Sequence, residues 1–388
     1  MRVLFDATPL QTGHRHRGIG AYARHLLQAL LAVDRETEYL LVAHPGPPLG
    51  LDLAAARARL ITLPRPSLGR LTAFVTHQAL LPAVFLRVRA DLFHSPGFTA
   101  AFSVPGIPWR CPMPLVVTLH DFIPLHVPAL SLHKPVNRAW YAWQRRLARR
   151  AAALICVSEA TRQEALRYVG AAADRLVVVH EGVDRRVFRP RGLTERPGEG
   201  LPAALPSTAR PYILFVGGDY PNKNRPAALA AFSRIVQATT LPHHLVLVGP
   251  DHTSAPELAE RYPGLDLRRV HRLAEVTRGE LAALYRQADA FLFPSTHEGF
   301  GLPLLEAMAS GAPVVAANIA ALQEVAGDAA LLVDPHDPDA IALALLRVLG
   351  DVALRGRLVS AGLARATTFT WERAAHATLE VYRRAVRG

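Results

Sequence analysis

Several features common in other classes of protein are missing from this sequence of 388 residues. Cys111 and Cys156 are its only cysteines, which excludes a disulfide framework and a cysteine-rich metal site. Apolar runs such as residues 151–157 are far shorter than the ~20 residues needed to cross a bilayer. The first residues, MRVLFDATPL, lack the long apolar stretch of a secretory signal. Because 50% of the residues are apolar and 20% are charged, we expect a globular, cytoplasmic protein.

Lysine is also scarce, although the chain is strongly basic. Lys134 and Lys223 are the only lysines among 44 basic residues. Because arginine and lysine are not interchangeable at a tight phosphate or sugar site, these two lysines are candidates for function. The net charge of +12 arises in the first half, where 24 basic and 12 acidic residues precede Arg191. Such a surplus could attract nucleic acid, anionic lipid headgroups or a phosphorylated ligand, or could keep the protein in solution.

Short apolar runs alternate with helical patterns along both halves of the chain. The runs are bounded by proline, glycine or polar residues, which is typical of buried strands. They are residues 3–5, 39–43, 91–94, 115–119, 154–157 and 176–179, and then 212–216, 245–248, 290–293, 313–316 and 330–333. The helical patterns include residues 19–33, 136–152, 159–169, 226–238, 278–288 and 303–310. This alternation predicts parallel sheets covered by helices on both faces.

A segment rich in proline and glycine, residues 191–210, separates the two halves and has the character of a linker. We therefore expect an α/β protein with two doubly wound, Rossmann-like domains, residues 1–190 and 211–370, which face a central cleft. In such sheets, ligands bind beyond the carboxyl ends of the strands.

The most informative stretch is residues 291–313, FLFPSTHEGFGLPLLEAMASGAP. A predicted strand is followed by a loop with Glu298 and Gly-Phe-Gly, and a helix then begins at Leu302 with Pro303 in its first turn. Glycines let the backbone approach a ligand closely, and a helix N-terminus offers N–H groups to a phosphate. Glu306 follows in the helix. Because carboxylates accept hydrogen bonds from sugar hydroxyls, the two glutamates beside a phosphate cradle predict a nucleotide-sugar site.

The stretch EGFGLPLLEAMASGAPVVA, residues 298–316, resembles the E-x7-E signature of the retaining GT4 glycosyltransferases, which have the GT-B fold. The likeness covers nearly the whole chain. It continues through GIGAYARHLL near the start, HDFIP at His120, VSEATR at Ser158, EGVD at Glu181, FVGGDYPNKN at Phe215 and TFTWERAA near the end. Within the family, HDFIP and GIGAYA most resemble bacterial mannosyltransferase-like members that build surface polysaccharides.

The resemblance assigns roles to individual residues. Glu298 would contact the donor-sugar hydroxyls, and Glu306 would bind the ribose hydroxyls. Lys223 would neutralise the diphosphate leaving group, and His120 would reach a donor-sugar hydroxyl from the first domain. Without the family context, Lys223 could be a surface lysine and His120 a structural histidine. Backbone N–H groups would face the donor at Gly299, Phe300, Gly301 and Leu302.

Gly18 and Gly20 would let the first domain approach the diphosphate or the acceptor. The same residues match G-x-G-x-x-A, the dinucleotide fingerprint, in which the first glycine follows a strand directly and an acidic residue ends the next strand. Here twelve residues separate Phe5 from Gly18, and Glu36 and Glu38 precede the second predicted strand. We therefore reject the reading as an NAD site.

Three positions depart from the pattern of the family. Many relatives have an arginine shortly before the lysine, where this chain has residues 217–219, Gly-Gly-Asp. Arg225 could supply that diphosphate contact, or it could be solvated at the start of a helix. Ala274 replaces a common glycine in the loop that usually meets the nucleobase, which leaves the base open. Gln323 replaces a usual proline.

Residues 138–150, RAWYAWQRRLARR, combine aromatic residues with arginines. This mixture suits a bilayer interface, but an ordinary helix could also pack its aromatics on the sheet. The first half is the acceptor half in this family, so a lipid-linked acceptor at the inner membrane face would explain its charge. The arginines form no nucleic-acid-binding motif.

The resemblance implies transfer of a hexose, mannose from GDP-mannose, to the hydroxyl of a saccharide or lipid-linked acceptor with retention of configuration. It requires no metal or further cofactor, and it implies that a final helix at residues 371–388 packs back on the first domain. The alternatives are glucosyl or GlcNAc transfer from a UDP-sugar, a nucleotide-sugar epimerase, a phosphorylase, and an inactive nucleotide-binding scaffold.

Overall fold

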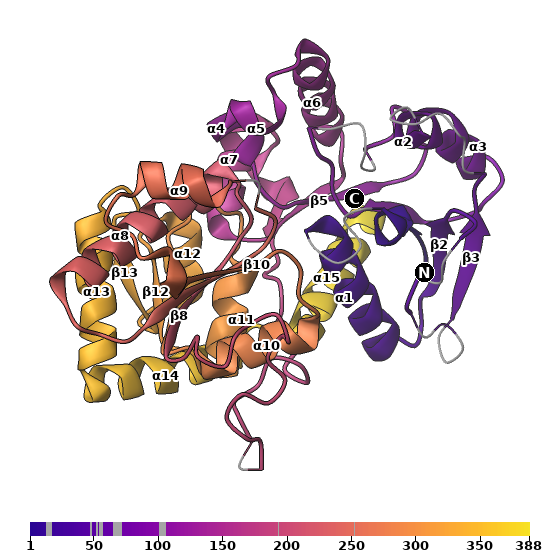
Figure 1. The fold of residues 1–388 in the computed structure, drawn as a ribbon. Coiled ribbons are helices and arrows are strands. Elements are labelled where there is room, and N and C mark those ends of the chain that lie inside the picture. Colours follow the sequence, from indigo (N-terminus) through magenta and orange to yellow (C-terminus); the bar gives the residue numbers. More distant parts are fainter. Residues whose placement is uncertain are drawn as a thin grey trace. The chain divides into compact units, whose positions relative to one another are not determined.

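The computed structural model describes residues 1–12, 18–46, 49–51, 53, 57–64, 72–100, 106–192, 194–251 and 253–388. The chain forms two compact units, Met1–Gly182 with Trp371–Gly388, and Val183–Thr370 (Figure 1). Residues 191–210, the predicted linker, belong to the second unit, and Leu193 among them lies outside the described residues. In this segment the backbone N–H of Gly198 donates to Oε1 of Gln287 over 2.6 Å.

The first unit is built on a seven-stranded sheet in the order β3-β2-β1-β4-β5-β6-β7. All neighbouring strands are parallel. The order reverses between β1 and β4, which makes a topological switch point. The strands are β1 (Arg2–Asp6), β2 (Glu38–Ala43), β3 (Ala58–Thr62), β4 (Leu92–Ser95), β5 (Leu115–Leu119), β6 (Ala153–Cys156) and β7 (Leu176–Val178).

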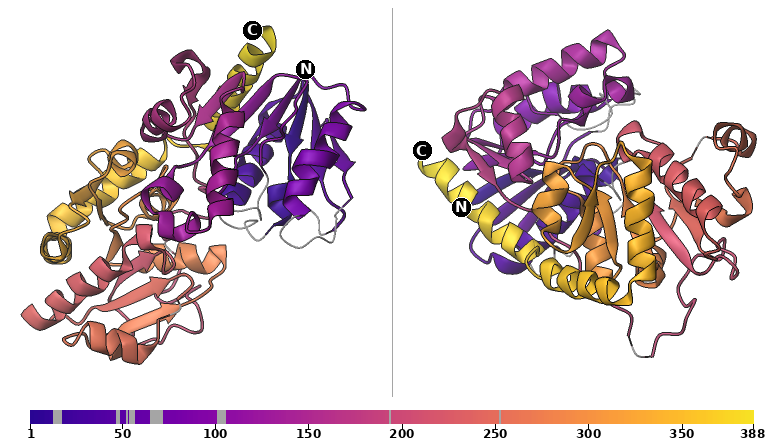
Figure 2. Two further views of the ribbon diagram at one scale, coloured as in Figure 1. Left: turned by 90° about the horizontal axis from the view of Figure 1, so that it is seen from above. Right: turned by 90° about the vertical axis from the view of Figure 1, so that its left-hand side faces the viewer.

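Helices of the first unit pack against this sheet (Figure 1 and Figure 2). The helix α7 begins where Oγ of Ser158 accepts a hydrogen bond from the backbone N–H of Thr161 over 3.0 Å, an N-cap that satisfies an otherwise unpaired donor. The helices are α1 (Ile19–Val33), α2 (Thr72–Val75), α3 (Leu81–Phe85), α4 (Ile123–His126), α5 (Pro128–Ser131), α6 (Pro135–Ala148), α7 (Glu159–Tyr168) and α15 (Trp371–Arg387), with short turns η1 (Thr8–Gln11), η3 (Thr76–Leu80) and η4 (Ala173–Arg175).

The last helix, α15, completes the first unit from the far end of the sequence. It packs along α1 and contacts the sheet at β4, β5 and β6. Tyr382 on α15 is fully buried, and its hydroxyl lies 2.5 Å from Nδ1 of His94 at the end of β4. The Nε2 atom of the same ring lies 2.9 Å from Oγ1 of Thr118. Burial lowers the pKa of His94 to about 3, so this histidine is neutral in the folded protein.

The second unit repeats the plan with a six-stranded parallel sheet in the order β10-β9-β8-β11-β12-β13. Its switch point lies between β8 and β11. The strands are β8 (Tyr212–Val216), β9 (His244–Val248), β10 (Val270–Leu273), β11 (Ala290–Phe293), β12 (Val314–Ala317) and β13 (Ala330–Val333). The helices are α8 (Arg225–Ala238), α9 (Ala255–Arg261), α10 (Arg278–Gln287), α11 (Leu302–Ser310), α12 (Ala320–Ala326), α13 (Pro338–Gly350) and α14 (Val352–Ala366), with short turns η5 (Pro221–Lys223) and η6 (Leu267–Arg269).

The predicted fold class is confirmed: both units are parallel sheets of the doubly wound type. Two strands, β3 and β10, were absent from the sequence-based prediction. Both lie at sheet edges, where partial exposure replaces the continuous apolar run of a central strand. In the part of the chain that the structure describes, no helix is both long and apolar enough to cross a membrane.

Candidate active site

The switch point of the second unit brings two predicted catalytic residues together. Lys223 lies in the connection from β8 to α8, and Glu298 lies in the connection from β11 to α11. The Nζ atom of Lys223 is 2.6 Å from Oε1 of Glu298. The side chains are 20% and 9% exposed, so the pair is reachable yet poorly screened by water. The same ammonium lies 5.2 Å from the centre of the Phe293 ring, at the end of β11.

Two asparagines beside the lysine bind these loops to each other. Asn224 adopts the left-handed conformation at φ 55°, which asparagine tolerates better than most residues. Its Nδ2 donates to the carbonyl oxygens of Pro294 (3.1 Å) and Pro335 (2.7 Å). The Nδ2 atom of Asn222 donates to the carbonyl of His297 over 3.3 Å. Sequence reasoning gave these asparagines no role, although both belong to the PNKN motif that identified the lysine.

The loop after β11 ends at Gly301, where any other residue would be strained. Gly301 has φ 111° and is the N-cap of α11, which begins at Leu302 with Pro303 in its first turn. A Cβ atom on Gly301 would lie 2.6 Å from Cδ2 of Leu322. Phe300 is 4% exposed, and its ring packs edge-to-face on Phe369 with centres 5.7 Å apart. The loop therefore buries its aromatic side chain and fixes the backbone at the helix start, where N–H groups favour an anion.

Glu306 lies on α11 and is partly buried. It influences a residue that sequence reasoning missed, Tyr285 on α10. Burial raises the pKa of the Tyr285 hydroxyl well above 10, and the negative charge of Glu306 raises it further. The second glutamate of the E-x7-E pair is thus close to a fully buried phenol.

The structure bears on one departure from the family pattern, Gly-Gly-Asp at residues 217–219, and on the arginine that could compensate for it. A Cβ atom on Gly217 would lie 3.1 Å from Cγ of Lys223, so the small residue leaves room for the lysine. Arg225 is neither solvated nor open to a diphosphate, because it is 4% exposed and paired with two carboxylates. Its guanidinium lies 2.5 Å from Oδ1 of Asp251 and 3.0 Å from Oδ2 of Asp219. Burial opposes ionisation of Asp251, but the contact with Arg225 holds the pKa of that carboxyl below its usual range.

In the first unit, His120 follows β5 and both of its ring nitrogens have acceptors. Nδ1 lies 3.3 Å from Oε1 of Glu181, and Nε2 lies 2.8 Å from the carbonyl oxygen of Pro96. Burial alone would lower the pKa of His120, but the hydrogen bond and charge of Glu181 raise it above its ordinary value. Because a carbonyl and a carboxylate both accept, the geometry fits an imidazolium that donates to each. Sequence reasoning named the EGVD motif but gave Glu181 no partner.

The helix α1, which carries the predicted glycines at its start, and this histidine both approach Gly97. Gly18 is the N-cap of α1, and Gly20 is buried in its first turn. Gly97 has φ 149°, and a Cβ atom there would lie 3.0 Å from Cδ2 of His120 and 3.1 Å from Cδ1 of Ile19. The start of α1 and His120 therefore converge on Gly97, which sequence reasoning missed.

The aromatic residues of α6 are not available to a membrane as a set. Trp140 and Tyr141 are 4% and 2% exposed, so they belong to the core of the first unit. Trp143 also packs inward, with its ring 5.4 Å from that of Trp140. The interfacial interpretation of these aromatics is wrong for Trp140 and Tyr141, because both side chains pack within the first unit: Nε1–H of Trp140 donates to the carbonyl of Thr99 over 3.1 Å, and the ring of Tyr141 lies 5.6 Å from that of Phe98.

Taken together, the second unit offers an ammonium, a paired carboxylate and a helix N-terminus at one switch point. Such groups can hold a diphosphate and orient sugar hydroxyls. Among the described residues, no group of three or more histidine, cysteine, aspartate or glutamate side chains is placed to hold a metal ion.

Comparisons with known proteins identify the family of the chain. Residues 210–351 match the family described as glycosyl transferases group 1, and residues 16–187 match glycosyltransferase family 4. The O-antigen chain mannosyltransferase B of Escherichia coli is 31% identical over 99% of this chain and 100% of its own length. A D-inositol 3-phosphate glycosyltransferase of Kineococcus radiotolerans is 33% identical over 82% of this chain and 77% of its own. The solved sucrose-phosphate synthase of Thermosynechococcus elongatus has a TM-score of 0.73 at 22% identity, covering 99% of this chain and 98% of that one.

The fold and the matched families define a glycosyltransferase of the GT-B type. The chain belongs to glycosyltransferase family 4, and it is an enzyme of the hexosyltransferase class.

Proposed function

We propose that this enzyme transfers mannose from GDP-mannose to the hydroxyl of a saccharide or lipid-linked saccharide, with retention of anomeric configuration. The observation that carries the site is the 2.6 Å contact between Lys223 and Glu298 at the switch point of the second unit. The choice of mannose is supported by the full-length similarity to the mannosyltransferase of O-antigen synthesis.

In this proposal the donor diphosphate binds at Lys223 and the N-terminus of α11. The lysine ammonium and the backbone N–H groups of residues 299–302 stabilise the negative charge that develops as the bond from the sugar C1 to the phosphate oxygen breaks. Glu298 accepts hydrogen bonds from donor-sugar hydroxyls, and Glu306 accepts them from the ribose. Asn222 and Asn224 are positioning residues, because they hold the two loops that carry the lysine and the glutamate.

The first unit supplies the remaining groups. His120, held by Glu181 and the carbonyl of Pro96, donates to a sugar hydroxyl or stabilises the departing diphosphate. The acceptor oxygen forms the new bond to C1 on the face that the phosphate leaves, and its proton passes to the leaving phosphate. No side chain is assigned as general base.

Incubation of the purified enzyme with GDP-mannose, UDP-glucose and UDP-GlcNAc and a mannose-terminated acceptor tests the proposal. We expect transfer from GDP-mannose and an α-linked product by NMR, the same anomeric configuration as the donor. Transfer from a UDP-sugar would keep the family and replace the donor, and a β-linked product would refute retention. Turnover without any acceptor would indicate an epimerase, and a requirement for inorganic phosphate would indicate a phosphorylase.

A further inference from the structure

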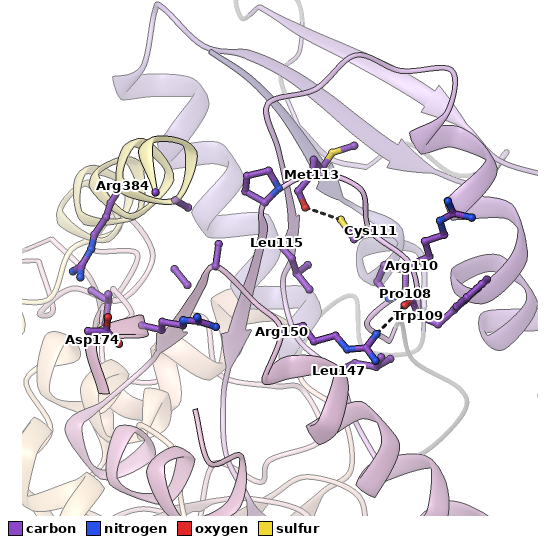
Figure 3. Close-up of a pocket in the computed structure, with 17 residues that line it drawn as sticks. Pro108, Trp109, Arg110, Cys111, Met113, Leu115, Leu147, Arg150, Asp174 and Arg384 are labelled. Carbon is purple, nitrogen blue, oxygen red and sulfur yellow. Dashed lines mark hydrogen bonds between the residues drawn. The ribbon is translucent and has the colours of Figure 1, made fainter. Parts of the chain in front are cut away.

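A cavity of about 660 Å³ opens in the first unit (Figure 3). Leu115 and Ala153, the first residues of β5 and β6, line it, so it lies at the amino ends of these strands. His120 follows the carboxyl end of β5, at the opposite edge of the sheet. Ligands of doubly wound folds bind at the carboxyl edge, so the fold by itself gives this cavity no function.

Four arginines line the cavity: Arg110, Arg150, Arg175 and Arg384. They come from the loop before β5, the residues after α6, the turn η4 and the helix α15. Asp174 is the one acidic side chain among the described lining residues. No ion pair to a carboxylate is formed by any of the four in the described structure, whereas Arg2, Arg189 and Arg225 each have one. The cavity therefore gathers four guanidinium groups and one carboxylate side chain, and Nη1 of Arg150 donates to the carbonyl of Trp109 over 3.4 Å.

The cavity is charged along its length and has a tryptophan at one end. Arg384 and Asp174 lie at one end, Trp109 and Arg110 lie at the other, and Arg150 lies between them (Figure 3). Trp109 is 51% exposed, yet it is held in place. Its Nε1–H donates to the carbonyl of Gln78 over 2.9 Å, and its backbone N–H donates to Oε1 of the same residue over 2.8 Å. A rigid, half-exposed indole loses little entropy when a sugar ring or hydrocarbon packs on it.

We propose that this cavity is a second binding site for an organic phosphate ester. The guanidinium groups of Arg150, Arg175 and Arg384 hold the phosphate or diphosphate, because each presents several N–H donors in a fork that matches phosphate oxygens. The carbon skeleton packs on Trp109 and on the apolar wall formed with Pro108 and Leu147. The ligand is either a soluble phosphate ester or the headgroup of an anionic lipid, since both present the same chemistry.

Binding of defined probes by calorimetry tests the site. The probes are mannose 1-phosphate, geranyl diphosphate, inorganic phosphate, and vesicles of phosphatidylcholine with phosphatidylglycerol. Arg150→Gln/Arg384→Gln removes two cavity charges, and Arg87→Gln/Arg138→Gln removes two exposed charges of the same unit outside the cavity. If the ligand is a soluble ester, we expect the soluble esters to bind about tenfold or more weakly to the cavity variant than to the control variant. If the ligand is a lipid headgroup, we expect the same difference for the anionic vesicles alone.

Two further variants separate this site from its alternatives. Trp109→Ala is expected to weaken the organic probe and leave inorganic phosphate unchanged, with its unfolding midpoint measured alongside. Lys223→Ala is expected to bind the probes like the wild type, whether or not the proposed transfer activity is correct. Four outcomes would overturn the proposal. Binding of the probes could be weakened equally in the cavity and control variants, or the organic probes could bind no more tightly than inorganic phosphate. Binding could also be weakened in Lys223→Ala alone, or no probe could bind at all.

Discussion

The Nζ atom of Lys223 and the Oε1 atom of Glu298 lie 2.6 Å apart, although the residues are 75 positions apart in the sequence. The contact couples two functions, because the cation proposed to meet the diphosphate also orients the carboxylate proposed to meet the sugar. A change in either residue therefore affects both the charge and the position of the other.

Substitution of the pair gives the first prediction. Glu298→Gln keeps the size but removes the charge, and we expect the rate of transfer to fall about 100-fold or more with little loss of GDP binding. Lys223→Ala loses transfer and also weakens GDP binding, which is measured as a smaller rise in the unfolding midpoint with GDP. Lys134→Ala is the matched control, because it removes the other lysine, which is exposed. Wild-type rates in both site variants would refute the assignment.

The pair of His120 and Glu181 predicts a pH effect. Glu181 raises the pKa of His120 in the folded state. The contact between the two residues therefore stabilises the protein fully below the pKa that His120 has in the unfolded chain, and this stabilisation is lost as the pH rises through the folded pKa. We expect Glu181→Gln to lower the pKa of the His120 imidazole, followed by NMR, and to destabilise the protein more at pH 6 than at pH 9. An unchanged histidine titration in the variant would contradict this coupling.

Arg225 predicts a loss of stability without a loss of nucleotide binding. Its side chain is 5% exposed. Because Arg225→Met leaves the carboxylates of Asp251 and Asp219 without this ion-pair partner, we expect it to lower the free energy of unfolding by about 3 kcal/mol. Arg268→Met is the control, since that arginine is 90% exposed and its ion pair with Asp266 contributes little. Chemical denaturation measures the difference, and GDP affinity at a permissive temperature is expected to remain near the wild-type value. A large loss of GDP affinity would restore Arg225 as a diphosphate ligand.

Two glycines of the second unit predict opposite outcomes for the same substitution. Gly301→Ala forces a Cβ atom to 2.6 Å from Leu322 at φ 111°, so we expect it to lower the unfolding midpoint and to reduce transfer. Gly279→Ala places a Cβ atom in open space in α10, and it is expected to leave activity unchanged and to stabilise the helix by up to about 1 kcal/mol. Thermal unfolding and initial rates of both variants decide the point.

Much of the fold follows from sequence periodicity. The predicted helix at residues 19–33 has the observed bounds of α1, because its apolar positions recur at helical spacing with glycine before it and Asp34 after it. The edge strand β3 was missed because only part of ARLIT is covered, so it lacks both the continuous run and the strict alternation of a buried strand. The helical pattern of the sequence predicted α6, but it did not indicate that Trp140 and Tyr141 are buried.

Less of the candidate site could be predicted, because its geometry depends on contacts between distant segments. Glu298 and Lys223 stand in motifs that can be seen in the sequence. Asn224 and Glu181 also stand in such motifs, but their contacts cannot be seen there. Asn224 bonds to the carbonyl of Pro335 over 2.7 Å across 111 positions, and Glu181 meets His120 across 61. A carbonyl acceptor has no residue type, so no sequence pattern marks it.

The place of α15 has a consequence for the order in which the protein is made. Residues 371–387 follow the whole second unit in the sequence, yet they cover α1 and supply Tyr382 to His94 in the first. On the ribosome, the second unit can therefore finish folding while the first, begun earlier, still waits for its last helix. Until α15 is made, the apolar side of α1 and the ring of His94 remain uncovered. The first unit therefore exposes most apolar surface to a chaperone before α15 has packed.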